Sequence, residues 1–431
     1  MMLRKAAPVM LALLIQSVYN IVDSLFVARF SPDGLTALSI LFPIQLLMTA
    51  FATGTGVGLG ILISRADGEG HTDGQGGLLK SGLFLGLVNY ILFALAGFFL
   101  MEPFMRLCSD SPAVQEAGMQ YAHTVMLGSF GLFTEGICTK ILQAKGRMTL
   151  PMAAQVTGAL INICLDPILI FGFFGMPEMG IRGAAAATII GQWAAMVVLL
   201  PAVSGMMPHG GQISAKSCLR IYKAGIPSIV MQSLYCLYIT GLNLILKQFT
   251  EDAVTVLGIY YKLQTFFFIP MLGLQQVLVP SFSYYYGAGR LEEGKKLLRS
   301  AVVFSVSCMC AGLLVFCILP DQMLGLFSGS VSVHEIGRTA FRIIGISFPA
   351  AGVTMMLTSW FQGVGRGAAC TGVTVLRQVI LLVPLAWLLH FLGLSAVWAT
   401  FPITEAITMA VCIVLMKQEK QEETEDHLTK L

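Results

Sequence analysis

Residues 36–63 read TALSILFPIQLLMTAFATGTGVGLGILI, a run of 28 residues that contains no charged side chain. A helix needs about 20 apolar residues to cross the hydrocarbon core of a bilayer, so this stretch predicts a membrane-spanning helix. The rest of the chain has the same character. Of 431 residues, 56% are hydrophobic and only 11% are charged, whereas soluble domains carry about 25% charged residues. An ordinary soluble enzyme is therefore excluded.

Eleven further apolar runs, separated by polar breaks, bring the number of predicted spans to twelve. The expected fold class is an all-α membrane protein with twelve transmembrane helices. The predicted spans cover residues 6–30, 36–63, 78–101, 117–143, 150–174, 183–206, 222–248, 252–281, 297–319, 338–363, 368–392 and 394–416.

The basic residues between the spans predict the orientation of the chain. Nineteen of the 26, with Arg377 counted among them, fall on the side that holds both termini, six fall on the other side, and Lys262 lies within a span. Cytoplasmic loops are enriched in Lys and Arg, so we expect both termini in the cytoplasm of a cell whose plasma membrane the chain crosses, the bacterial inner membrane. A net charge of +3 favours no nucleic-acid partner. We expect a monomer in the lipid bilayer, and no cofactor, because the ten cysteines form no CxxC pair.

An internal repeat divides the chain into two halves. The sequence LQAKGR at 142–147 matches FQGVGR at 361–366 at an offset of 219, and Pro167 matches Pro384 at 217. Two further short matches lie at offsets of 212 and 227. Parallel six-helix repeats around a membrane-normal axis are typical of alternating-access transporters. The predicted domains are a six-helix lobe with a cation site at 1–205, a cytoplasmic linker at 206–221, a second pseudo-symmetric six-helix lobe at 222–416, and a charged, disordered cytoplasmic tail at 417–431.

Two acidic residues in the first lobe carry the main functional signal. Asp23 and Asp166 lie seven and eight residues from the outer ends of their predicted spans, so their depths match. An ionisable group in hydrocarbon costs about 2.5–3.5 kcal/mol on insertion scales and requires an explanation. Asn20 and Asn162 precede them at helical spacing, and Thr188 lies near the start of the next span. Two carboxylates, amides and a hydroxyl can bind a proton or Na⁺.

The repeat separates a functional interpretation of these acids from a structural one. Asp23 maps to Leu242 and Asp166 maps to Val383, so the second lobe lacks both carboxylates. Acids that served only the scaffold would be expected in both copies. The asymmetry therefore favours function over capping or pairing inside the bundle, for which Arg29 and Arg182 are the distant candidate partners.

The second lobe holds its own polar candidates. Lys262 and Glu405 lie at equal depth, which suggests either a buried ion pair or contact with a substrate. Tyr261 belongs to an aromatic-rich span that could line a pocket for apolar cations. No nucleophile and base share a depth, so we expect no enzyme. A flippase for a lipid-linked sugar or a peptidoglycan precursor remains the alternative, although Lys262 alone offers little charge for an anionic substrate.

Several motifs together resemble a known family. They are YNIVDSLFV at 19–27, AKGR at 144–147, NICLDP at 162–167, GIRGAAAAT at 180–188, IYYKLQ at 259–264, YGAGR at 286–290 and GVGR at 363–366. The set resembles the MATE (multidrug and toxic compound extrusion) exporters over residues 6–416. The resemblance implies export of small organic cations and drugs, driven by entry of H⁺ or Na⁺.

The resemblance also implies particular site residues. The coupling-cation site of the DinF-like branch falls on Asp23, Asn162, Asp166 and Thr188, in agreement with the site inferred from depth. The NorM-like branch carries acids on its seventh and tenth spans. Here the seventh span offers Gln232 and Asn243 as candidate substrate contacts, and the tenth has no acid. We therefore expect a DinF-like protein, with the coupling ion left open between H⁺ and Na⁺.

Overall fold

The computed structural model describes residues 2–71, 75–206, 211–327 and 330–429, and within these ranges every regular element is helical. Ten helices are long and apolar enough to cross a membrane, and two further pairs of bent helices bring the number to as many as twelve. The predicted all-α class with twelve spans is confirmed. The chain divides into two compact units, Met1–Gln232 and Ser233–Leu431, and the division falls inside α8.

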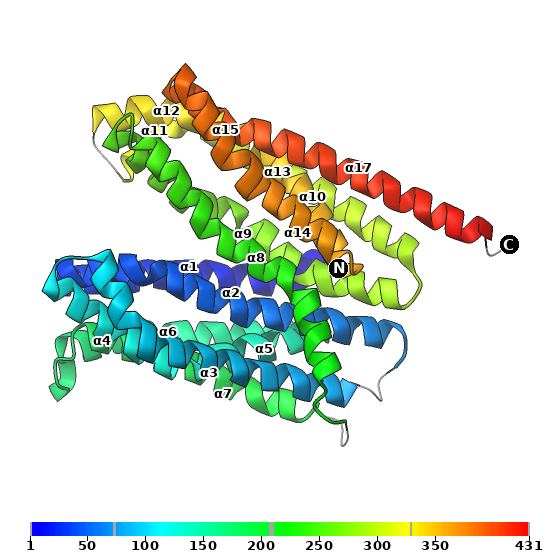
Figure 1. Ribbon diagram of the computed structural model, residues 1–431, viewed down its shortest axis with the longest axis horizontal. Helices are drawn as coiled ribbons and strands as arrows, with labels where there is room; N and C mark the ends of the chain where they lie inside the picture. Colours follow the sequence, from blue (N-terminus) through cyan, green and yellow to red (C-terminus); the bar gives the residue numbers. More distant parts are fainter. Residues whose placement is uncertain (1, 72–74, 207–210, 328–329, 430–431) are drawn as a thin grey trace. The chain divides into compact units, whose positions relative to one another are not determined.

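The first unit runs from blue to green in Figure 1. Its helices are α1 (Met2–Phe30), α2 (Pro32–Gly68), α3 (Gln75–Cys108), α4 (Pro112–Gly128), α5 (Phe130–Ala144), α6 (Thr149–Phe171), η1 (Phe173–Gly175), α7 (Ile181–Ser204) and the first part of α8 (Ala215–Leu246). α8 begins at Ala215, so the second half of the predicted linker is helical.

The second unit contains the rest of α8 and runs from green to red in Figure 1. Its other elements are α9 (Glu251–Gly287), α10 (Leu291–Ile318), α11 (Pro320–Gly325), α12 (Val331–Gly345), α13 (Phe348–Gly363), α14 (Gly367–Val375), the π-helix η2 (Leu376–Leu381), α15 (Leu382–Leu389), η3 (His390–Leu392), α16 (Leu394–Trp398) and α17 (Thr400–Thr429). α17 continues as helix to Thr429 and therefore includes most of the charged tail predicted at 417–431.

Two predicted spans are bent rather than straight. The span at 117–143 breaks between α4 and α5 with an angle of 47°, and that at 338–363 breaks between α12 and α13 with an angle of 46°. Ser129 and Ser347 are buried at the two breaks, and each hydroxyl donates to the carbonyl three residues earlier, at 2.7 and 2.6 Å. A side chain that enters the backbone hydrogen-bond ladder bends a helix, and the two serine hydroxyls account for these breaks.

The internal repeat is visible in the backbone at helix ends. Gly70 and Gly289, which are 219 residues apart, both have positive φ, and so do Gly146 and Gly365 at the same offset. In all four turns the residue after the glycine donates its backbone N–H to a carbonyl five residues back, at 2.8–3.0 Å. This hydrogen bond is part of the Schellman motif that ends a helix. The repeat predicted from sequence therefore extends to the way the helices end.

Glycines let two helices of the first unit pack backbone to backbone. A Cβ added to Gly58 on α2 would lie 2.1 Å from the carbonyl oxygen of Ile221 and 2.7 Å from the amide nitrogen of Gly225, both on α8. Such close approach is possible only without a side chain. Away from these contacts the helices expose apolar side chains such as Phe98 and Phe99, which suits a surface that faces lipid.

Candidate cation-coupling site

Three helices of the first unit bring the predicted site residues together. α6 packs against both α1 and α7. Asp166 and Asn162 lie one turn apart on α6, with exposed fractions of 0% and 3%. The Asn162 amide nitrogen lies 3.4 Å from Asp166 Oδ1 and 3.4 Å from Thr188 Oγ1 on α7. The predicted association of these three residues is therefore present in the structure.

Asp23 joins this group from α1. Its carboxyl group lies within hydrogen-bonding reach of that of Asp166. Both groups are acceptors when ionised, so no hydrogen bond can form between them until a proton is shared. Among the described residues, Asp23 Oδ1, Asp166 Oδ2 and Asn162 Oδ1 are buried without a donor. Buried polar atoms normally have a partner, so this cluster of acceptors fits a bound cation or proton.

Asn20 does not share the buried environment of the other candidates. It lies on α1 three residues before Asp23, but its side chain is exposed. Its backbone carbonyl accepts a hydrogen bond of 2.8 Å from the Ser24 hydroxyl. The structure thus gathers Asp23, Asn162, Asp166 and Thr188 and leaves Asn20 at the exposed side of the helix.

Two further residues, which the sequence analysis missed, lie near the site. Tyr121 on α4 is buried, and its hydroxyl accepts a hydrogen bond of 2.9 Å from the amide of Gln45 on α2. The same hydroxyl lies within electrostatic range of Thr188 and Asp23. Tyr121 lies nine residues into α4, a depth comparable to those of the aspartates, so the depth comparison could have found it had it included tyrosines.

The corresponding place in the second unit is apolar. Leu242 on α8, which aligns with Asp23, has an exposed fraction of 1%. A Cβ on the neighbouring Gly241 would lie 3.0 Å from a methyl group of Val383, the residue that aligns with Asp166. α8 and α15 therefore meet at the residues that the sequence offset predicts, and this contact contains no carboxylate.

The predicted pairing of Lys262 with Glu405 is wrong. Glu405 on α17 instead accepts a hydrogen bond of 2.6 Å from Arg377 Nε on η2, and the two side chains form an ion pair. Arg377 lies ten residues into the span that begins at Gly367, so its assignment to a cytoplasmic segment is also wrong. Lys262 is exposed on α9, and its ammonium group lies 5.8 Å from the centre of the Phe327 ring.

The other candidate substrate residues fall in different places. Gln232 donates a hydrogen bond of 2.7 Å to Thr53 Oγ1, which joins α8 to α2 in the first unit. Asn243 is half-buried on α8 in the second unit. Tyr261 is buried on α9, where its ring packs against Tyr260, with a centroid distance of 5.2 Å.

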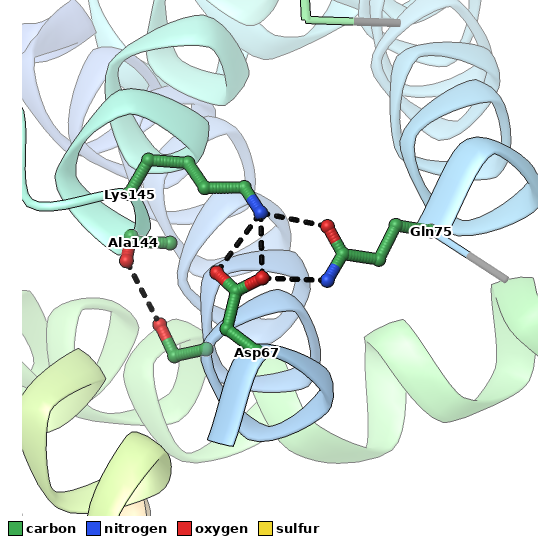
Figure 2. A network of polar contacts seen from close by, with 5 residues as sticks. Asp67, Gln75, Ala144 and Lys145 are labelled. Atoms are coloured by element: carbon green, nitrogen blue, oxygen red, sulfur yellow. Dashed lines mark hydrogen bonds and ion pairs between the residues drawn. The ribbon is translucent and has the colours of Figure 1, made fainter. Parts of the chain in front are cut away.

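A charged network closes one end of the first unit (Figure 2). Lys145, at the end of α5, lies 2.7 and 2.9 Å from the two carboxylate oxygens of Asp67 on α2, and 2.7 Å from Gln75 Oε1 on α3. The Gln75 amide also donates to Asp67, at 2.7 Å. Lys145 belongs to the repeated LQAKGR motif, and its partners show that this motif holds three helix ends together.

Comparison with known proteins agrees with this fold. The family model described as MatE matches residues 8–168 and 227–388, two segments that begin 219 residues apart, as the internal repeat does. The multidrug export protein MepA of Staphylococcus aureus is 24% identical over 96% of this chain and 92% of its own length. A protein of Shewanella oneidensis named FAD transporter is 22% identical over 93% of this chain and 90% of its own.

Solved structures extend the comparison to three dimensions. The Vibrio cholerae MATE transporter VcmN superposes with a TM-score of 0.91 at 22% identity, over 98% of this chain and 96% of the other. The family match covers both units and includes Asp23 and Asp166. The chain therefore belongs to the MatE family and is a multi-pass membrane transporter.

Proposed function

We propose that the protein is a secondary active multidrug exporter that antiports lipophilic organic cations against H⁺ or Na⁺. The observation that carries the proposal is the cluster of three buried, donorless oxygens on Asp23, Asn162 and Asp166. A relative named as a multidrug export protein supports the substrate class. The second unit has an apolar contact at the matching place, which supports a coupling role confined to the first.

The mechanism follows from charge and from the repeat. When the site faces outward, the Asp23–Asp166 pair takes up one H⁺ or Na⁺, and the neutralised pair allows the α1, α6 and α7 region to repack. Repacking lowers the affinity for the drug, which dissociates to the outside. The lobes then change to the inward-facing conformation, and the ion is released inside. Inward movement of one charge yields about 2.3 kcal/mol per 100 mV. Exchange of one proton for a monovalent cation is electroneutral, so the pH gradient would then drive export.

Substitution of the two carboxylates tests the proposal. Asp23→Asn and Asp166→Asn keep the side-chain shape but remove the titratable charge, so both should abolish drug efflux at normal expression. Glu116→Gln is the matched control, because Glu116 is an exposed acid on α4 outside the site, and it should transport like wild type. Wild-type efflux by both aspartate variants would contradict the coupling role.

A second experiment separates the two coupling ions. Ethidium efflux is followed after a Na⁺ jump at clamped pH and, separately, after a pH jump at constant Na⁺. Efflux that responds only to the first indicates Na⁺ antiport, and efflux that responds only to the second indicates H⁺ antiport. A response to neither would contradict coupling to either ion.

One argument against the flippase alternative becomes weaker, and a second takes its place. Lys262 is not the only base within the spans, because Arg377 lies half-buried beside Glu405. The pair is neutral as a whole, so it offers no net positive charge to a pyrophosphate. Inverted vesicles that accumulate a fluorescent cation under a pH gradient would favour export over lipid flipping. FAD belongs in the same assay as an anionic competitor, given the relative named as its transporter.

A further inference from the structure

The buried Arg377–Glu405 pair of the second unit has no part in the coupling mechanism. Glu405 has an exposed fraction of 7%, and Arg377 approaches it from the π-helix η2. Arg377 lies ten residues beyond the start of α14, about 15 Å along a helix axis, and therefore near the middle of a hydrocarbon core of about 30 Å. Glu405 lies eleven residues beyond the start of α16. Glu405 is therefore a buried charge deep in its span, and the Arg377 side chain beside it is half-buried.

The pair leaves hydrogen-bonding capacity unused. Nε and Nη2 of Arg377 both approach Oε1 of Glu405, and Oε2 of Glu405 is buried without a partner among the described residues. Gln378 Oε1 and the Tyr261 hydroxyl are buried without partners as well. Carboxylate and amide oxygens are acceptors, so the groups that would satisfy them are donors. A ligand that carries N–H groups supplies such donors.

Aromatic rings surround the pair. Phe401 lies one turn before Glu405 on α17, and its ring centre is 5.5 Å from that of Tyr260 on α9. The Tyr261 ring lies 6.1 Å from that of Tyr238 on α8. Phe401 therefore connects the Tyr260 ring to the part of α17 that carries Glu405. Aromatic faces attract cations, so rings and carboxylate favour the same kind of ligand.

We propose that the tyrosine–glutamate cluster, defined as Tyr238, Tyr260, Tyr261, Arg377 and Glu405, is a binding subsite for aromatic cations with N–H donors, namely amidines and guanidines. Arg377 keeps Oε1 of Glu405 in this arrangement, and the substrate cation donates its N–H groups to the unpartnered Oε2. The rings then stack against the planar part of the substrate. This inference rests on the proposed export of organic cations and specifies which of them the second unit selects.

The need for N–H donors separates the proposed ligands from aromatic cations that have none. An amidinium presents two parallel N–H groups to a carboxylate, as arginine does, and such bidentate pairs are strong and directional. A tetraphenylphosphonium ion has the same charge and aromatic surface but no N–H donor. It can bind the rings, but it cannot donate a hydrogen bond to the unpartnered Oε2 of Glu405. The two ligands should therefore differ in their dependence on Glu405.

Equilibrium binding to the purified full-length protein tests this difference. The probes are the fluorescent bis-amidine DAPI and tetraphenylphosphonium. Glu405→Gln should weaken DAPI binding at least tenfold and change tetraphenylphosphonium binding less than twofold. Glu102→Gln is the matched control, because it breaks an exposed ion pair with Arg106, and it should change neither. Equal weakening of both probes, or no change for DAPI, would overturn the proposal.

A second variant keeps the test decisive if Glu405→Gln does not fold. Replacement of both partners, as Arg377→Met with Glu405→Leu, removes the charges together and leaves none unpaired. This double variant should bind tetraphenylphosphonium as wild type does, but it should no longer bind DAPI in preference to tetraphenylphosphonium. A retained preference for DAPI would overturn the proposal. Drug efflux coupled to Asp23 and Asp166 is measured separately in cells. If the aspartate variants lose efflux but the double variant keeps its DAPI preference, the subsite proposal fails and the export proposal stands. If the aspartate variants keep efflux but the double variant loses its DAPI preference, the export proposal fails and the subsite proposal stands.

Discussion

At the residue scale, the proposed coupling site contains three buried oxygens, on Asp23, Asn162 and Asp166, that have no donor among the described residues. Asn162 connects Asp166 on α6 to Thr188 on α7, through contacts of 3.4 Å each. Asp23 faces the same carboxyl group from α1. One cation or proton bound here would therefore interact with side chains on three helices, α1, α6 and α7. A site of this kind can convert a change of charge into a change of packing.

Thr188 provides a graded test of the site. Thr188→Ala removes the hydroxyl that Asn162 contacts, and loss of one hydrogen bond costs about 1 kcal/mol. The concentration of H⁺ or Na⁺ that gives half-maximal efflux should therefore rise about fivefold. Thr188→Ser keeps the hydroxyl and should behave like wild type. An unchanged half-maximal concentration in the alanine variant would remove Thr188 from the site.

Arg377 provides a test of stability at the same scale. Arg377→Met leaves Glu405 buried and unpaired, which should destabilise the protein by about 3–5 kcal/mol. The double replacement Arg377→Met with Glu405→Leu should recover most of that loss, because no charge is left buried. Unfolding in a denaturing detergent measures both variants. Equal stability of the single and double variants would show that Glu405 finds another partner.

A third residue-scale test lies outside the spans, at α11. Hydrogen bonds from Arg338, with the nearby His334, hold the pKa of Asp321 below its usual value. A carboxylate with a lowered pKa stabilises the folded state at neutral pH and loses that contribution as the pH falls through its folded pKa. Asp321→Asn should therefore be less stable than wild type at pH 7, and the difference should vanish in acid. A difference that persists in acid would assign the effect to packing.

At the scale of elements, close helix contacts depend on glycine. Gly58→Ala would place a methyl group 2.1 Å from the carbonyl of Ile221 on α8, so α2 and α8 must separate and the melting temperature should fall by several degrees. Gly258→Ala on α9 is the matched control, because nothing lies within 4 Å of the added carbon. It should be neutral or slightly stabilising. Equal melting temperatures for the two variants would contradict the packing of α2 on α8.

The positions of the helices could be predicted from sequence, but their internal breaks could not. Apolar runs locate all twelve spans because hydropathy is a local property. The bends at Ser129 and Ser347 depend on a hydroxyl that enters the backbone ladder, and a serine within an apolar run gives no such signal. The partner of Glu405 was missed for a similar reason. Arg377 lies 28 residues away, and only the folded π-helix brings the two together.

At the scale of the whole molecule, the repeat is the feature that the sequence revealed most reliably. The offset of 219 relates the positive-φ glycines of helix ends and the two segments that match the family model. The departures from symmetry could also be predicted from the sequence, because the aspartates of the first unit align with Leu242 and Val383. Tyr121 was missed because the search for site residues within the spans began from charged side chains, and a tyrosine is uncharged. A repeat thus identifies the scaffold, and its exceptions identify the candidate sites.

The orientation of the whole chain is the last prediction. The excess of basic residues at one side predicts that both termini lie in the cytoplasm, so the end of α3, where Cys108 is exposed, should face outward. A membrane-impermeant maleimide should label Cys108 in intact cells but not in inverted vesicles, and Cys108→Ser should remove that labelling. Cys218, four residues into α8, should show the opposite pattern. Labelling of Cys108 only in inverted vesicles would reverse the assigned orientation, and with it the direction in which Asp23 and Asp166 take up their ion.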